Sequence, residues 1–116
     1  MCKRGDIFYA DLGDCLDTSE QRGLRPVLIV SNDMANTYSQ VVTAVPLTSK
    51  LKKRKLPTHV YIPAGACRGL NRPSMVLAEQ VMSIDKSRLL NWRGNLADEA
   101  LMQRITQALK VQIGAG

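Results

Sequence analysis

Short apolar runs separated by turn-forming residues occupy the first three quarters of the chain. The runs are rich in Val, Ile and Thr, which favour extended backbone. We expect strands over residues 7–10, 27–31, 41–47, 58–62 and 75–82. Gly, Pro, Asn and Asp mark the turns between them. Because no helix alternates regularly with these runs, the pattern favours an antiparallel, partly closed small barrel over a doubly wound parallel sheet.

The last part of the chain has a helical period instead. From about residue 97, four apolar residues follow the spacing i, i+4, i+7 and i+8: Leu101, Ile105, Ala108 and Leu109. This spacing places them on one face of a helix, which we expect to pack on the core. Acidic residues suit its first turn and Lys110 its last. Shorter helical turns are expected over 85–89 and after Asn32 and Asp33.

The chain has the length and composition of one domain, which we expect to span residues 1–116. Of its 116 residues, 45% are hydrophobic and 22% charged, enough for one modest core. No apolar run approaches the roughly 20 residues that cross a bilayer, and charged residues precede the first apolar run, unlike a secretory signal. We therefore expect a cytoplasmic protein without a membrane partner.

The cysteines and the histidine make a metal site improbable. Cys2, Cys15 and Cys67 form an odd set without CxxC spacing, so neither a disulfide framework nor a zinc site is predicted. With one histidine and no cluster of carboxylates at ligand spacing, we expect no metal and no other cofactor. The cysteines should be free thiols in or near the core, as in a reducing cytoplasm.

Positive charge is concentrated in one segment. The net charge is +6, and residues 50–55 read Lys-Leu-Lys-Lys-Arg-Lys, which holds five of the 16 basic residues and no acid. The remaining 11 basic residues nearly balance the 10 acidic ones. Such a block indicates a site for a polyanion, with Lys52, Lys53 and Lys55 as candidate contacts. The alternative is a solvated loop without a partner, and the sequence leaves both open.

Two polar stretches adjoin expected strands and could carry chemistry. Residues 19–26 supply a carboxylate, an amide and two guanidinium groups, and residues 46–49 end in two hydroxyls. Together they could hold a phosphate and move a proton, which could suffice to cleave RNA through its own 2′-hydroxyl. Two structural roles compete with this one: Arg25 pairing with Glu20 or Asp33 on the surface, and Thr48 and Ser49 ending a strand.

Several of these segments, in order, resemble the MazF/PemK family of toxin endoribonucleases. The resemblance spans nearly the whole chain. It rests on Arg-Gly-Asp-Ile at 4–7, Ser-Glu-Gln at 19–21, Gly23 with Arg-Pro-Val-Leu-Ile at 25–29, Ser-Asn-Asp at 31–33, Pro-Leu-Thr-Ser at 46–49, Leu-Pro-Thr-His-Val at 56–60, Glu-Gln at 79–80 and Ile-Asp-Lys-Ser-Arg-Leu at 84–89.

This resemblance implies a fold, an activity and partners. The implied fold is an SH3-like barrel with a C-terminal helix, assembled as a homodimer. The implied activity is sequence-specific cleavage of single-stranded mRNA without a metal, by attack of the 2′-hydroxyl, leaving a 2′,3′-cyclic phosphate and a 5′-hydroxyl. The implied partner is a cognate antitoxin that binds the toxin and covers its RNA groove.

The resemblance also implies roles for residues at matching positions. Arg25 of the GxRP motif and Thr48 of the PLTS motif are the catalytic candidates. Arg25 would neutralise the charge developing on the phosphorus centre, and Thr48, assisted by Ser49, would hydrogen-bond a phosphate oxygen. Glu20 is a secondary candidate for proton transfer, and the general base stays open. The substrate-binding candidates are Ser19, Gln21, Ser49 and Gln80.

Two other functions remain in competition with cleavage. One is a gyrase-poisoning toxin on the same barrel, which acts by protein binding and does not need the GxRP and PLTS residues. The other is a nucleic-acid-binding barrel without catalysis. The segment from 65 to 73, with Arg68 and Arg72, falls in the family's variable region, so no sequence specificity follows from it.

Overall fold

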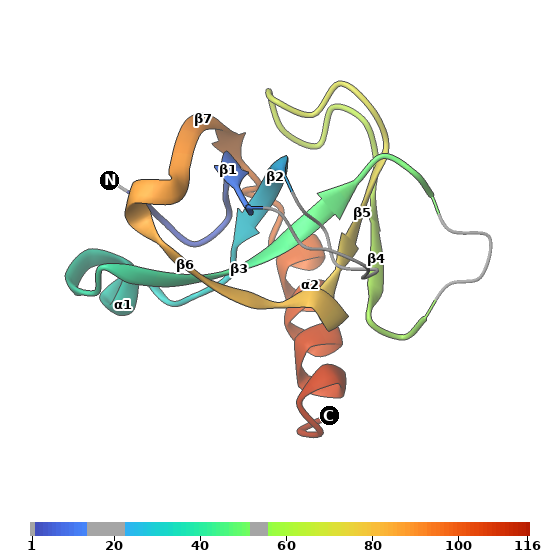
Figure 1. Ribbon diagram of the computed structural model, residues 1–116. Coiled ribbons are helices and arrows are strands. Elements are labelled where there is room, and N and C mark those ends of the chain that lie inside the picture. The colour runs from blue at the N-terminus through green and yellow to red at the C-terminus, as the bar shows by residue number, and fades with distance from the viewer. Residues whose placement is uncertain (1, 14–22, 52–55) are drawn as a thin grey trace.

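The computed structural model describes residues 2–13, 23–51 and 56–116. Figure 1 shows curved strands packed against a C-terminal helix. The elements are β1 Asp6–Asp11, β2 Leu24–Ile29, α1 Asp33–Tyr38, β3 Val41–Thr48, β4 His59–Ile62, β5 Ser74–Leu77, the short 3-10 helix η1 Ala78–Gln80, β6 Met82–Asp85, the 3-10 helix η2 Lys86–Arg88, β7 Leu89–Asn95 and α2 Glu99–Gln112.

All the strand pairs are antiparallel, in the order β4-β5-β3-β2-β1-β7. The long strand β3 is the centre of this arrangement, because its first half also pairs with β6 while its last residues pair with β5. Among the described strands, β4 and β7 form the two ends of the path. The predicted mainly antiparallel fold with a C-terminal helix is therefore confirmed, and the barrel is only partly closed.

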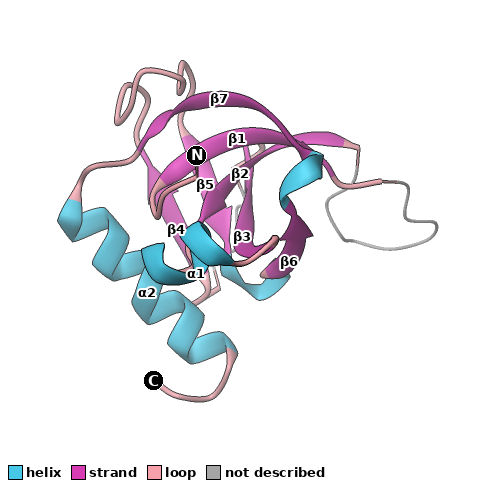
Figure 2. Ribbon diagram, turned by 90° about the vertical axis from the view of Figure 1, so that its left-hand side faces the viewer, coloured by secondary structure: helices cyan, strands magenta, loops and turns pink. Residues whose placement is uncertain are grey.

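Strand β2 shows why the sheet strands are so continuously apolar. Leu28 belongs to the main core, which lies between the sheet and α2, whereas its neighbours Val27 and Ile29 belong to a second cluster on the opposite face. Successive side chains of a strand point to opposite faces, so both faces of this strand are buried. Figure 2 shows α2 lying along one side of the strands, and there the predicted apolar stripe is buried at Leu101, Ile105 and Ala108.

Local capping residues begin the helices where expected. The Asp98 side chain accepts a hydrogen bond from the Leu101 backbone N–H at 3.1 Å, so α2 begins at Glu99. Asn32 caps α1 in the same way through the Ala35 N–H at 2.8 Å. The turn expected over 85–89 is the 3-10 helix η2, capped by Asp85.

The strands differ from the expectation in three places. The run over 75–82 is not one strand, because η1 interrupts it and allows β5 and β6 to pair with opposite halves of β3. Strand β2 begins at Leu24 rather than 27 and ends at Ile29. Strand β7 was not expected, because its pairing with β1 shifts register at two points and therefore lacks a regular alternation.

Cys2 is buried and Cys67 half-buried, and both are free thiols as predicted. Cys15 lies outside the described residues. Within the described parts of the chain, no helix is long and apolar enough to cross a membrane.

Candidate active site

A hollow of about 370 Å³ opens where β2 and β3 meet β7 and the loop between β4 and β5. Arg25, Thr48 and Ser49 all line it. The strand register explains why: Val27 lies opposite Pro46 in the antiparallel β2–β3 pair, and continuing this register by two residues brings Arg25 across from Thr48. Two residues separated by 23 positions in sequence thus face the same small space.

The Thr48 hydroxyl has a local hydrogen bond and remains able to donate another. Its Oγ1 accepts the Lys50 backbone N–H at 3.1 Å, which is the strand-ending interaction that competes with a catalytic role in the sequence. A hydroxyl that accepts one hydrogen bond keeps its own proton for donation. The local bond therefore orients the half-buried hydroxyl without preventing it from contacting a phosphate oxygen.

Two further arginines line this hollow, and the sequence had pointed to neither as a site residue. Arg72 comes from the β4–β5 loop and Arg93 from β7, so with Arg25 the hollow holds three guanidinium groups. The described lining residues include no Asp or Glu. A hollow that collects positive charge and hydroxyl donors is suited to a phosphate group. The only signal in the sequence was that the β4–β5 loop has arginines and no acid.

Of the other predicted site residues, only Gln80 is among the described residues, and it does not line this hollow. Gln80 lines a separate one of about 410 Å³, which also includes Leu12, Met82 and Arg88. The remaining candidates lie outside the described residues: Ser19, Glu20, Gln21, Lys52, Lys53 and Lys55.

A carboxylate outside the hollow has a well-defined set of partners. Glu79 accepts hydrogen bonds from the Thr58 hydroxyl at 3.0 Å and from His59 Nε2 at 2.9 Å. Because His59 Nδ1 accepts the Leu56 backbone N–H at 3.1 Å, the ring hydrogen must lie on Nε2. Burial alone would raise the pKa of Glu79, but these hydrogen bonds outweigh it and lower the pKa. This network joins the residues before β4 to η1.

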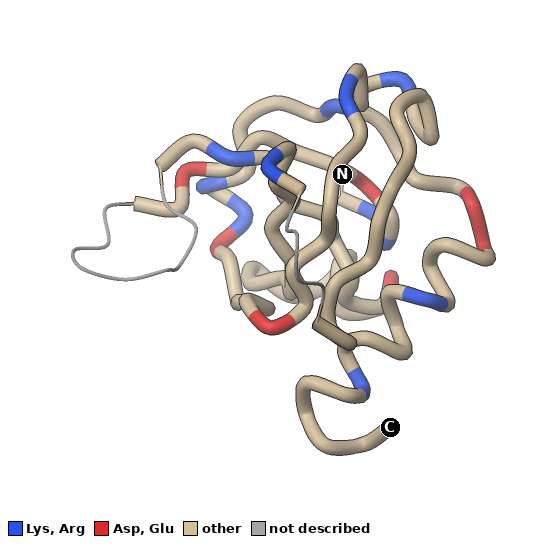
Figure 3. Tube along the Cα trace, turned by 90° about the vertical axis from the view of Figure 1, so that its right-hand side faces the viewer, with Lys and Arg blue, Asp and Glu red and all other residues tan. Residues whose placement is uncertain are grey.

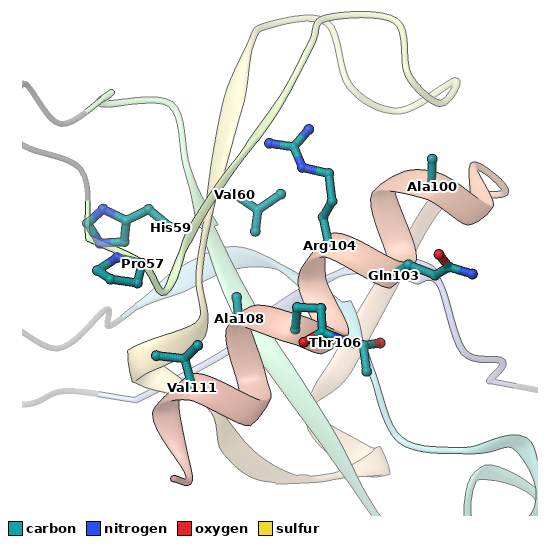
Figure 4. Close-up of a pocket in the computed structure, with 10 residues that line it drawn as sticks. Pro57, His59, Val60, Ala100, Gln103, Arg104, Thr106, Ala108 and Val111 are labelled. Carbon is teal, nitrogen blue, oxygen red and sulfur yellow. The ribbon is translucent and has the colours of Figure 1, made fainter. Parts of the chain in front are cut away.

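A larger hollow lies away from the predicted catalytic residues Arg25 and Thr48. It has about 690 Å³ and lies between α2 and the start of β4. Figure 4 shows Gln103 and Arg104 extending from α2, with Pro57 and His59 on the other side. None of the predicted site residues that the structure describes lines it. Within the described residues, no group of three His, Cys, Asp or Glu is arranged to hold a metal ion.

Charged residues along the chain also distinguish the hollow that contains Arg25 and Thr48. In Figure 3 the β4–β5 loop, at the top of the view, contains basic segments and no acidic one. This loop forms one wall of the hollow that holds Arg25 and Thr48.

Comparisons with known proteins agree with one another. A family model described as PemK-like, MazF-like toxin of type II toxin-antitoxin system matches residues 3–113. The endoribonuclease EndoA of Bacillus subtilis strain 168 is 41% identical over 113 residues, which cover 97% of this chain and 95% of that protein. The endoribonuclease MazF of Staphylococcus saprophyticus is 38% identical over 98% of this chain and 92% of its own length.

Solved structures give the same result. A mycobacterial endoribonuclease in complex with its cognate antitoxin superposes with a TM-score of 0.79 at 29% identity, covering 100% of this chain and 98% of that chain. MazF from Deinococcus radiodurans has a TM-score of 0.79 at 25% identity, covering 97% of this chain and 96% of that chain.

Proposed function

This chain belongs to the PemK-like, MazF-like toxins of type II toxin-antitoxin systems, and from this premise we propose that it is an endoribonuclease that cleaves single-stranded mRNA. The observation that supports this most directly is the placement of Arg25 and Thr48 on neighbouring strands at one hollow. A guanidinium and a hydroxyl donor at that spot match the charge that develops on a phosphate under attack.

The proposed reaction uses the nucleophile that RNA itself contains. The 2′-oxygen attacks the adjacent phosphorus as its proton passes to a base, and the bond from phosphorus to the 5′-oxygen breaks as that oxygen takes up a proton. The products are a 2′,3′-cyclic phosphate and a 5′-hydroxyl. DNA lacks the 2′-hydroxyl and is therefore not cut.

Roles within the site follow from the chemistry of each side chain. Arg25 neutralises charge on the phosphorane-like transition state, and Thr48, with Ser49 beside it, donates to a non-bridging oxygen. A guanidinium holds its proton too firmly to act as a good general base, so Glu20 is the secondary candidate for proton transfer. No metal is needed in this scheme, because the arginines supply the positive charge.

Substrate contacts outside the reacting atoms form the second part of the proposal. Ser19, Gln21 and Gln80 bind bases or sugars of the RNA. The basic residues of the 50–55 segment attract its backbone.

We further propose that the protein is cytoplasmic, forms a homodimer and is held inactive by a cognate antitoxin. The support is a mycobacterial endoribonuclease of the same fold, 29% identical, that has been solved with its antitoxin. An acidic antitoxin segment would compete with RNA for a surface rich in arginine.

The test is cleavage of a long RNA of mixed sequence in excess EDTA, with sequencing of the new 5′ ends. We expect cuts at a short motif and 5′-hydroxyl ends. Intact RNA over a wide range of sequences would overturn the proposal. Two results would favour the competing functions: RNA bound with a steep salt dependence but never cut, or gyrase-dependent DNA breaks in treated cells without RNA cleavage.

Variants at the two catalytic positions make the test specific. We expect Arg25→Ala and Thr48→Ala each to abolish detectable cleavage, since removing one transition-state donor costs about 100- to 1,000-fold in kcat, while RNA binding survives. Thr48→Ser is the matched control, because it keeps the hydroxyl and should retain most activity. Near-normal turnover in either alanine variant would remove that residue from the mechanism.

A further inference from the structure

Arg93 occupies an irregular position in β7. In the β1–β7 pair, Phe8 lies opposite Trp92 and Ile7 opposite Gly94, so Arg93 is an extra residue in β7 at a register shift. Such a bulge bends the strand and redirects the side chain of the extra residue. The half-buried Arg93 side chain lines the hollow that contains Arg25 and Thr48.

The Arg93 guanidinium lies against an aromatic ring. Its carbon Cζ lies 5.2 Å from the centre of the Tyr9 ring, within the range of a cation–π contact. Among the described residues, no Asp or Glu lies within ion-pair distance of Arg93 or Arg72. Arginines gathered in a concave site without carboxylates suit an anionic ligand.

Close backbone packing brings Arg72 to the same place. A Cβ atom at Gly69 would lie 1.8 Å from the Arg93 carbonyl oxygen, so only glycine allows the β4–β5 loop to approach β7 this closely. Arg72 follows Gly69 by three residues and lines the hollow together with Arg93. The loop and the bulged strand thus place two arginines 21 positions apart in sequence on one hollow.

We propose that Arg72 and Arg93 form a second phosphate subsite, which binds a backbone phosphate of the RNA next to the one held by Arg25 and Thr48. This inference rests on the proposed function. The planar guanidinium fork binds phosphate oxygens in pairs, so the subsite fixes the position of the chain relative to the reacting phosphate. Arg72 and Arg93 are positioning residues and do not touch the bond that breaks.

The test measures binding separately from cleavage. The probe is a short RNA with the mapped cleavage site and a single 2′-deoxy nucleotide in place of the attacking hydroxyl, so that the protein cannot cut it. Its dissociation constant is measured over a range of salt for wild type, Arg72→Ala, Arg93→Ala and Arg104→Ala. Arg104 is the matched control, because it is an exposed arginine of α2 that lines a different hollow.

We expect each subsite variant to weaken binding about tenfold, as for a lost charge-assisted hydrogen bond, and to make the salt slope shallower by about 0.7, as for one lost contact to a single strand. Arg93→Lys should keep the slope, and Arg104→Ala should change neither quantity. On cleavable RNA, KM should rise while kcat changes by less than about threefold, since a contact to a neighbouring phosphate stabilises the bound substrate and the transition state equally.

A second probe identifies the phosphate. A neutral methylphosphonate replaces one flanking phosphate at a time, and one such position should reduce wild-type affinity yet have little added effect on Arg93→Ala. Unchanged affinity and slope in both subsite variants, or additive effects at every position, would overturn the subsite. Arg93→Gln, checked by thermal unfolding, replaces the alanine variant if the latter fails to fold. Failure of the proposed function would show differently, as wild-type protein that binds RNA but never cuts it.

Discussion

At the scale of single residues, Glu79 shows how a polar group outside the proposed active site supports the fold. Its carboxylate receives hydrogen bonds from Thr58 and His59, whose side chain is only 4% exposed. His59 in turn receives the Leu56 backbone N–H. These bonds hold the chain just before β4, from Leu56 onward, against η1.

The Glu79 network predicts a loss of stability in acid. Because hydrogen bonds lower the pKa of Glu79 in the folded protein below its ordinary value of 4.5, the unfolded chain binds the proton more readily. The stabilisation is therefore fully present above about pH 4.5 and is lost as the pH falls through the folded pKa. Thermal unfolding should be followed between pH 6 and pH 3. We expect Glu79→Gln to have a lower Tm than wild type near pH 6, and the difference in Tm to shrink as the pH falls.

The matched control is Glu99→Gln, an exposed glutamate in the first turn of α2. Because both variants remove one carboxylate, the stability difference between Glu79→Gln and Glu99→Gln isolates the contribution of the Glu79 network, and it should shrink in acid. An equal pH dependence in wild type and Glu79→Gln would mean that the network around Glu79 contributes no pH-linked stability.

At the scale of elements, the β4–β5 loop and β7 form one unit. The loop has two arginines and the strand one, and the two segments meet where Gly69 approaches the backbone of Arg93. The same unit forms part of the wall of the Arg25 hollow. Changes to this packing should therefore alter RNA binding even when no charged residue is touched.

Gly69→Ala tests that coupling. Because its Cβ would overlap the Arg93 carbonyl oxygen, the loop has to move away from β7, at a cost of about 1–3 kcal/mol in the free energy of unfolding. We expect a lower Tm and a loss of RNA affinity similar to that of Arg72→Ala. Gly65→Asn is the control in the same loop, since its φ of +82° suits Asn and nothing lies within 4 Å of its Cβ. If Gly69→Ala has a lower Tm but binds RNA with wild-type affinity, the packing of this loop on β7 does not contribute to RNA binding.

At the scale of the whole molecule, most of the net charge of +6 falls in one segment of the sequence, residues 50–55. The basic segment 50–55 directly follows Thr48 and Ser49 in the chain, and both of these line the hollow. The positive charge of this segment attracts a phosphate backbone over several ångströms of solution. In the proposed function this segment captures the substrate, and Arg25 and Thr48 carry out the chemistry.

Neutralising the segment should change binding more than chemistry. We expect the triple change Lys52→Gln, Lys53→Gln and Lys55→Gln to weaken RNA binding and to reduce the salt slope by up to about 2, at about 0.7 per contact. The control removes the same charge elsewhere, at Lys3, Arg104 and Lys110. If the salt dependence of RNA binding has the same slope in the two triple variants, the segment is a solvated loop without a partner.

The class of fold, the C-terminal helix and the basic segment that directly follows the polar residues Thr48 and Ser49 could all be predicted from the sequence. Apolar period, capping residues such as Asn32 and Asp98, and a block of lysines are local properties, readable over a few residues. That is why β1, β3, β4, α1 and α2 lie close to their predicted places. The family resemblance added Arg25 and Thr48 as a pair, and the β2–β3 register brings them to one hollow.

Only the tertiary structure decided which other residues join that pair. Arg93 enters the hollow because β7 bulges against β1, and Arg72 because Gly69 lets a loop pack on the same strand. Gln80, adjacent to Glu79 in a recognised motif, lines a different hollow. Register shifts and backbone contacts between distant segments depend on the packing of the whole sheet, and no short stretch of sequence encodes them.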